Sequence, residues 1–308
     1  MLTHLYKRRS VFLLANYLLP LDFRFIYLIS VMRSLFKAIL AGALAFFSLV
    51  AAAYPWQARH GMSATDYQNT FNQLVGQGYR LTDVSGYPVN NNPTFAAIWV
   101  QEPSVAWVAR HGMTADQYQQ NFNTYVAQGY RPILVDGYTV NGVAYFAAIW
   151  DQSSSTGWVA RHGMTSAQYQ SAFDTYVAQG YRLKHVSGYA QGNVDYYAAI
   201  WEKPTTNAAW VAHHGMTSAQ YQTYFNQYTA QGYRPILVGG YVVNNVDYYV
   251  AIWENSPSGA WVARHGMTSA GYQSEFNNWV AQGYTLTVVS GYTLNGNQDT
   301  YAAIWYKQ

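Results

Sequence analysis

The sequence predicts an α+β protein built from five tandem β-α-β-β repeats of about 51 residues. Three observations carry this prediction. Tryptophan recurs at spacings of 51, 51, 52 and 51 residues, at Trp56, Trp107, Trp158, Trp210 and Trp261. A helix start signal follows each of them, and each copy ends in an apolar AAIW or VAIW segment. Because self-similarity at a fixed period defines a repeat architecture, it overrides the estimate of two ordinary domains from 308 residues.

The first half of each copy is predicted to be a strand and a capped helix. The opening segment, WVARHGM in the third copy, is typical of a short strand. A Thr then stands three residues before a Gln, the capping-box pattern, at Thr114, Thr165 and Thr217. Ser63 and Asp66 hold these places in the first copy. In the last copy Thr268 faces Gly271, so we expect the reciprocal hydrogen bond to be missing there.

The helix body carries one apolar face. In the third copy this stripe has the i, i+4, i+7, i+8 spacing of a buried helical surface: Tyr169, Phe173, Tyr176 and Val177. A glycine stands after each helix, where a left-handed residue closes the last turn: Gly78, Gly129, Gly180, Gly232 and Gly283.

Two strand-like runs complete each copy. In the second copy they are YRPILVDGY and AYFAAIWD, joined through Asn141-Gly142, a dipeptide that favours a tight hairpin. A chain as short as one copy is marginally stable by itself. We therefore expect neighbouring repeats to complete each other's cores.

The strand after the helix alternates in sequence. Odd copies read LTDVSGY, LKHVSGY and LTVVSGY, whereas even copies read PILVDGY and PILVGGY. Pro132 and Pro235 cannot donate to a sheet ladder, so they belong at a strand start or edge. We expect the structural repeat to be a pair of units in different environments. Duplication of a two-unit block, without structural alternation, is the competing explanation.

Two segments precede the repeats. Residues 32–53 combine basic Arg33 and Lys37, an apolar run and Ala51-Ala52-Ala53, which is the pattern of a secretory signal peptide. The run is shorter than the roughly 20 residues of a membrane span, so a secreted product without a stable span is expected. Residues 1–31 are interpreted as a gene-model extension or leader, with an uncleaved membrane anchor as the alternative. The repeats are expected at 54–103, 104–154, 155–205, 206–257 and 258–308.

The repeat region is rich in aromatic residues and nearly uncharged. Aromatic residues make up 18% of the chain and charged residues 10%. From Tyr54 onward 11 basic residues face 13 acidic ones, so the positive field of a nucleic-acid-binding protein is missing. The absence of cysteine excludes disulfides, thiol nucleophiles and cysteine-zinc sites. We expect no cofactor, no metal and no nucleic-acid partner.

The string W-V-A-R-H-G-M-T-S-A-x-Y-Q-x-x-F, followed by A-Q-G-Y-R, S-G-Y and Y-A-A-I-W-E, resembles the bacterial tandem repeat family across residues 56–306. Such repeats also form the N-terminal region of fungal polyglycine hydrolases and related beta-lactamase-like serine hydrolases. The resemblance implies that neighbouring repeats pair as half-barrels. The catalytic serine of those hydrolases lies in a separate C-terminal domain that we do not find here, so the resemblance implies an accessory or substrate-engaging role. The Ser-x-x-Lys motif at Ser34–Lys37 falls in the signal peptide.

The Arg-His-Gly tripeptide is the strongest candidate for a catalytic motif. The candidate polar residues are Arg59, His60, Arg110, His111, Arg161, His162, His213, His214, Arg264 and His265. A histidine phosphatase carries a similar tripeptide between a strand and a helix. However, the unit is too small for a catalytic domain, and no activating partner recurs beside it. We favour a structural role, in which His bonds to local backbone and Arg stacks on aromatic rings, over catalysis or metal binding.

The hairpin turns are candidate binding sites, since loops carry function and exposed aromatic and amide groups suit sugars or extended peptides. These residues are Asn90, Asn91, Asn141, Asn244, Asn245, Asn295 and Asn297. Ordinary turn chemistry is the alternative. We expect a secreted, non-catalytic binding module for an extracellular polymer or protein. The alternatives are a hydrolase-associated protein, a histidine-phosphatase-like enzyme, and a purely structural surface protein.

Overall fold

The structure is a computed structural model that describes residues 54–307. The predictions for residues 1–53, including the signal peptide and Ser34–Lys37, lie outside the described residues. Residues 54–307 form one compact unit. The order β-α-β-β occurs five times in the described part, which confirms the predicted fold class.

Each repeat has a first strand, a helix and two further strands. Repeat 1 contains β1 (Trp56–Ser63), α2 (Ala64–Gly76), β2 (Arg80–Val89) and β3 (Asn92–Val100). Repeat 2 contains β4 (Trp107–Thr114), α3 (Ala115–Ala127), β5 (Arg131–Val140) and β6 (Val143–Asp151). Repeat 3 contains β7 (Trp158–Thr165), α4 (Ser166–Ala178), β8 (Arg182–Gln191) and β9 (Val194–Glu202). Repeat 4 contains β10 (Ala209–Thr217), α5 (Ser218–Ala230), β11 (Arg234–Val243) and β12 (Val246–Asn255). Repeat 5 contains β13 (Trp261–Thr268), α6 (Ser269–Ala281), β14 (Tyr284–Leu294) and β15 (Gln298–Lys307).

The helix ends follow the predicted chemistry. The Gln117 N–H donates to Thr114 Oγ1 at 3.3 Å, and the Thr114 N–H donates to Gln117 Oε1 at 2.9 Å, so the capping box forms. Helices α4 and α5 repeat this box. At α6 only the Thr268 cap remains, because Gly271 has no side chain to return the bond. The glycines after the helices adopt φ between 78° and 85°, as predicted.

The three strands of each repeat form an antiparallel sheet whose last strand is central, as in β1-β3-β2. The register is the same in every copy: the tryptophan that ends AAIW or VAIW faces Leu81, Pro132, Leu183, Pro235 or Leu286. The expected structural difference between odd and even copies is therefore wrong for strand pairing. Pro132 and Pro235 lie on an edge strand beside a register shift, where a missing donor is tolerated.

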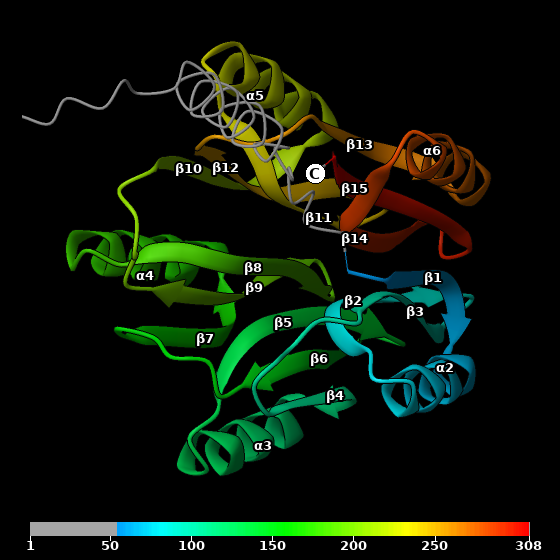
Figure 1. Ribbon diagram of the computed structural model, residues 1–308, viewed down its shortest axis with the longest axis horizontal. Helices are drawn as coiled ribbons and strands as arrows, with labels where there is room; N and C mark the ends of the chain where they lie inside the picture. The colour runs from blue at the N-terminus through cyan, green and yellow to red at the C-terminus, as the bar shows by residue number, and fades with distance from the viewer. Residues whose placement is uncertain (1–53, 308) are drawn as a thin grey trace, which may run out of the picture. The chain divides into compact units, whose positions relative to one another are not determined.

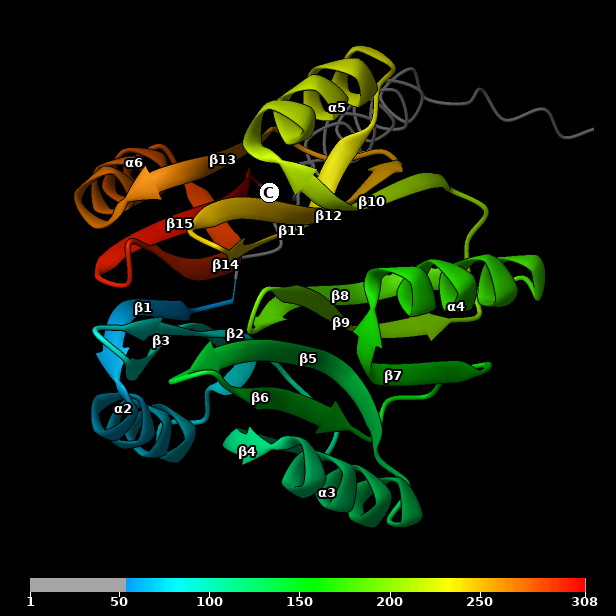
Figure 2. The ribbon, with the colours of Figure 1, turned by 180° about the vertical axis from the view of Figure 1, so that it is seen from behind.

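Adjacent repeats pack against each other, and repeat 5 also packs against repeat 1, so the five repeats close into a ring (Figure 1). A tyrosine ring of the next repeat covers one glycine in each copy. An ideal Cβ on Gly86 would lie 2.5 Å from the Tyr138 ring, and one on Gly291 would lie 2.3 Å from the Tyr87 ring. Real Cβ atoms do not approach this closely, so only glycine fits. Strands β2, β5, β8, β11 and β14 face the centre of the ring, and the helices lie outside them (Figures 1 and 2).

Each hydrophobic core is shared between two repeats. The first core joins Tyr67 and Trp99 of repeat 1 to Ile149 of repeat 2. The core that closes the ring joins Trp305 of repeat 5 to Ile98 of repeat 1. The prediction that neighbours complete each other's cores is thus confirmed.

The predicted helical stripe is one residue too wide. Tyr169 is buried, but Val177 remains 37% exposed. Successive helical residues are separated by about 100° of rotation, so the i+8 residue points away from a contact centred between i and i+4. Val75 and Val280, at the corresponding positions of α2 and α6, are also exposed.

A row of polar contacts joins the starts of the inward-facing strands. Arg80 pairs with Asp151 of repeat 2 at 3.3 Å. Arg131 pairs with Glu202 of repeat 3, and Arg182 pairs with Glu254 of repeat 4. Arg234 donates to the Tyr306 hydroxyl of repeat 5 at 2.6 Å.

The row stops where the ring closes. Thr285 occupies the arginine position of repeat 5, and Val100 occupies the acidic position of repeat 1. The junction of repeats 5 and 1 is therefore held by its shared core and by other bonds, such as Gly291 N–H to Ser85 Oγ at 3.1 Å.

Candidate functional site

The Arg-His-Gly tripeptides lie at the junctions between repeats. Each sits at a shift in the pairing of the first strand, where the glycine has a positive φ, for example 63° at Gly112. This kink directs the histidine toward the preceding repeat. The His111 ring lies 4.7 Å from the Tyr67 ring and 5.2 Å from the Phe95 ring, both edge-on. His60 makes the same contacts with Tyr272 and Tyr301 of repeat 5.

Burial lowers the pKa of these histidines below the usual value: His60, His111, His162, His214 and His265. Two of them also contact a serine hydroxyl at the start of the preceding helix. Ser166 Oγ lies 3.1 Å from His214 Nε2, and Ser218 Oγ lies 3.2 Å from His265 Nε2. The five histidines are distributed one to a junction and do not converge. Within residues 54–307 no group of three or more His, Asp or Glu side chains is placed to hold a metal ion.

The arginines of the tripeptides turn outward onto aromatic rings. The Arg110, Arg161 and Arg264 guanidinium groups lie 5.5–5.6 Å from the centres of the Tyr125, Tyr176 and Trp279 rings. Arg59 donates to its neighbouring carbonyl, on Ala58, at 2.7 Å. In repeat 4 the ring of His213 takes the arginine's place. It stacks on Tyr224 at 4.0 Å, and its Nε2 lies 2.7 Å from the Tyr228 hydroxyl.

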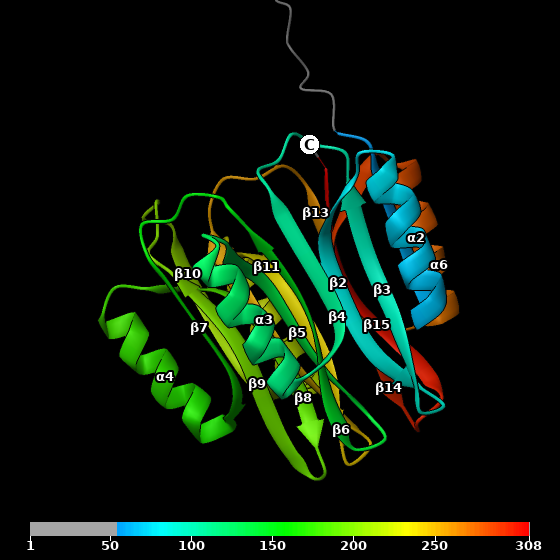
Figure 3. The ribbon, with the colours of Figure 1, turned by 90° about the horizontal axis from the view of Figure 1, so that it is seen from below.

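The hairpin turns are gathered at one end of the ring (Figure 3). The asparagines at these tips adopt the left-handed region, with φ between 49° and 61°: Asn90, Asn91, Asn141, Asn244, Asn245 and Asn295. Asn297 lies beside them and its N–H donates to the Leu294 carbonyl at 3.3 Å. Neighbouring tips are hydrogen-bonded, since the Asn90 N–H donates to the Gly296 carbonyl at 2.8 Å and Asn245 Nδ2 donates to Asn295 Oδ1 at 2.6 Å.

Apolar side chains project beside these turns. Val143, Val194 and Val246 each follow a hairpin turn and are 45–46% exposed. We call the tip asparagines and these three valines the hairpin rim. The hairpin rim combines amide groups with apolar surface. Hydrogen bonds between neighbouring turns support it.

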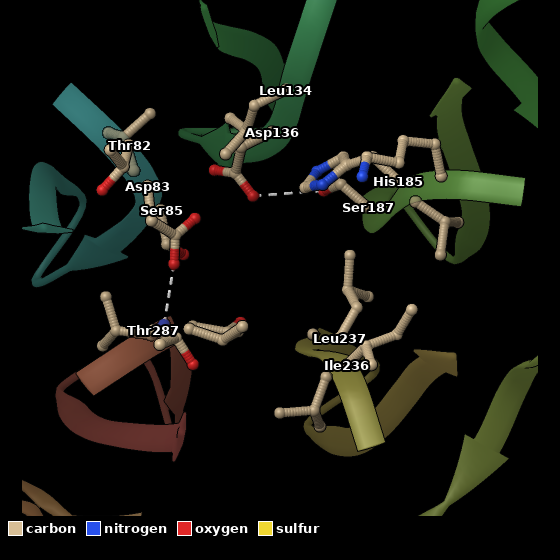
Figure 4. A pocket seen from close by; sticks show the side chains of 18 of the residues that line it. Thr82, Asp83, Ser85, Leu134, Asp136, His185, Ser187, Ile236, Leu237 and Thr287 are labelled. Atoms are coloured by element: carbon tan, nitrogen blue, oxygen red, sulfur yellow. Dashed lines mark hydrogen bonds between the residues drawn. The ribbon is translucent and has the colours of Figure 1, made fainter. Parts of the chain in front are cut away.

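A cavity of about 470 Å³ lies at the centre of the ring, among the inward-facing strands of all five repeats (Figure 4). Sequence reasoning missed this site. Its lining includes four ionisable side chains from three repeats: Asp83, Asp136, Lys184 and His185. A signal was present in the sequence, because these positions are ionisable in some copies and apolar in others, as at Asp83 and Leu134.

Hydrogen bonds fix the two carboxyl groups of the cavity. Asp83 Oδ2 accepts from the Val289 N–H at 2.8 Å. Asp136 Oδ2 accepts from the Gly86 N–H at 2.7 Å, and its other oxygen accepts from Ser187 Oγ at 3.2 Å. Desolvation nevertheless raises the pKa of Asp83 to about 7 and that of Asp136 to about 8.

His185 is another ionisable group of the lining. Its Nε2 lies 3.1 Å from the Val135 carbonyl oxygen, the geometry of a ring N–H donating to that carbonyl. Desolvation lowers the pKa of His185 to about 4, so the ring is neutral at pH 7. The cavity thus combines two carboxyl groups, a neutral imidazole and the Lys184 amine.

The fold and these sites define a protein made of β-α-β-β repeats closed into a ring, with a polar rim and a central cavity. A family model described as a polyglycine hydrolase-like structural repeat matches residues 53–102, 104–153, 155–204, 207–256 and 258–308. The chain therefore belongs to this repeat family, and the resemblance noted from the sequence is confirmed. The described residues contain no helix that is both long and apolar enough to span a membrane.

Proposed function

We propose that this chain is a secreted, non-catalytic module that binds an extracellular polymer or protein through the hairpin rim. The observation that carries the proposal is the rim itself. Five turns from separate parts of the sequence lie at one end of the ring, and hydrogen bonds join the tips of repeats 4, 5 and 1. Rim amides come from repeats 1, 2, 4 and 5 and rim valines from repeats 2, 3 and 4, so successive copies can contact successive units of a repetitive ligand.

Secretion is inferred from residues 32–53. The absence of an enzymatic role is inferred from the placement of the Arg-His-Gly histidines, which pack singly against aromatic rings at the junctions. This packing explains the presence of the histidines without assigning them a catalytic role.

The test is a pull-down of the purified chain on insoluble polysaccharides, cell walls and glycine-rich peptides. The rim variant carries Val143→Glu, Val194→Glu and Val246→Glu. A matched control carries Val75→Glu, Val177→Glu and Val280→Glu, at valines of similar exposure on the helices. We expect selective retention on one ligand, lost in the rim variant and kept in the control. No retention on any ligand, or equal loss in both variants, would refute the proposal.

A hydrolytic enzyme is the second candidate, favoured by the two serine–histidine contacts. A hydroxyl 3.1 Å from a neutral imidazole matches the distance between a nucleophile and its base. Labelling with a fluorophosphonate probe distinguishes the two functions. Labelling that disappears in Ser166→Ala or Ser218→Ala would support the enzyme, and no labelling would support the binding module.

A further inference from the structure

The five copies agree where they build the ring and differ where they line the cavity. Positions that pack in the shared cores repeat without change, such as Tyr67, Tyr118, Tyr169, Tyr221 and Tyr272. Two successive positions of the inward-facing strands read Thr82-Asp83, Ile133-Leu134, Lys184-His185, Ile236-Leu237 and Thr287-Val288. Repeats 2 and 4 share the Ile-Leu pair, whereas repeats 1, 3 and 5 each carry a different one. Four different pairs therefore surround one cavity.

The lining combines carboxyl groups, a lysine and apolar side chains. Asp83 and Asp136 come from repeats 1 and 2, and Lys184 comes from repeat 3. Leu134 and Leu237, from repeats 2 and 4, contribute apolar surface to the same cavity (Figure 4). The cavity therefore has distinct places for a cation, an anion and an apolar body.

Three ionisable side chains of the cavity form no ion pair among the described residues. The ion pairs of the described residues involve other side chains, and Asp83, Asp136 and Lys184 take part in none of them. Nearby Arg234 and Glu254, which also line the cavity, already pair with each other. Asp83 and Asp136 are partly buried and Lys184 is exposed. Ionisable groups that line one cavity without forming ion pairs are typical of binding sites.

We propose that the central cavity binds a small apolar peptide with free amino and carboxyl ends. The peptide ammonium is bound by Asp83 and Asp136, its carboxylate by Lys184, and its side chains pack on Leu134 and Leu237. The volume of about 470 Å³ lies in the range of small-molecule sites, roughly 300–1,000 Å³. This site is separate from the hairpin rim, so the two proposals stand or fall independently.

The test is isothermal titration of the full chain with leucyl-leucine, N-acetyl-leucyl-leucine and leucyl-leucine amide. We expect leucyl-leucine to bind and each blocked peptide to bind at least about tenfold more weakly, because one charge contact is lost in each; tenfold corresponds to about 1.4 kcal/mol. These comparisons use the unaltered protein and do not depend on any variant folding.

Variants assign each end of the peptide. Asp83→Asn should weaken leucyl-leucine about tenfold and leave the N-acetyl peptide unchanged, whereas Lys184→Met should leave the amide unchanged. Asp116→Asn and Lys203→Met, at charges outside the central cavity, are the matched controls and should bind normally. Absence of leucyl-leucine binding at millimolar concentration, or equal binding of all three peptides, would overturn the proposal.

Discussion

Gly239 and Val250 are a compensating pair in repeat 4. In the other repeats the residue before the Gly-Tyr step carries a side chain and faces an alanine, as Ser187 faces Ala198. In repeat 4 Gly239 faces Val250, which is fully buried. An ideal Cβ on Gly239 would lie 2.9 Å from Val250 Cγ2, so the two side chains cannot both be present without a shift.

The structure gives the size of each effect. Gly239→Ser alone overpacks a buried site and should lower the free energy of unfolding by about 2 kcal/mol. Val250→Ala alone removes two buried methyl groups and should cost about 2 kcal/mol. The double variant recreates the Ser–Ala arrangement. It also supplies an acceptor for Gly188 N–H, equivalent to the 3.0 Å bond from Gly137 N–H to Ser187 Oγ, which is worth about 1 kcal/mol.

The double variant should therefore be at least as stable as the natural chain, which requires a coupling energy of at least about 4 kcal/mol between the two sites. Urea unfolding followed by both tryptophan fluorescence and far-ultraviolet circular dichroism measures it, and coincident transitions justify a single free energy. If the two single effects add to within about 0.5 kcal/mol, the reasoning is refuted.

Three other predictions follow from the ring. Gly137→Ala should cost at least about 3 kcal/mol, because the new Cβ would lie 2.4 Å from the Tyr189 ring, whereas Gly76→Ala, which meets no atom within 4 Å, should be neutral or stabilising. Asp151→Ala should cost about 3 kcal/mol in urea unfolding, because it leaves Arg80 without its acid, and equal stability would contradict this account. The junction histidines have a pKa lowered by burial, so their contribution to stability is present above pH 6.5 and is lost as the pH falls from 6.5 through the lowered pKa of the folded protein. Asp83 and Asp136 have raised pKa values. Their contribution to stability is therefore lost as the pH rises toward about 7 and 8. The thermal midpoint should peak near about pH 6.5, and the variant with Asp83→Asn and Asp136→Asn should lose only the alkaline decline; an unchanged decline would exclude these carboxyls as its source.

The order of elements could be predicted from sequence because it depends on local chemistry. The cap at Thr114, the glycine at Gly129 and the turn at Asn141-Gly142 each satisfy backbone groups within a few residues. The same locality explains why the expected difference between odd and even copies failed. Pro132 revealed an edge position correctly, but a missing N–H on an edge strand carries no information about the neighbouring repeat.

Ring closure and the cavity could not be predicted in this way. Closure depends on Tyr87 covering Gly291, two residues separated by most of the chain. Until closure is known, Asp83 and Lys184 are simply side chains on one face of separate strands. The hairpin turns were predicted correctly, because asparagine readily adopts the positive φ that these turns require. Their convergence on one end depends on how the repeats are arranged.

Repeats 5 and 1 pack together without a covalent linker between them. The arrangement of repeats around the ring therefore does not require a particular repeat to come first in the chain. Four junctions are spanned by covalent linkers, and the fifth achieves the same packing without one. A circularly permuted protein is therefore compatible with this architecture: a short peptide would join the end of β15 to the start of β1, and new termini would open in the segment between β6 and β7. Such a molecule would keep all five shared cores and both faces of the ring. The gene determines where around the ring the chain begins and ends. The five shared cores do not depend on that position.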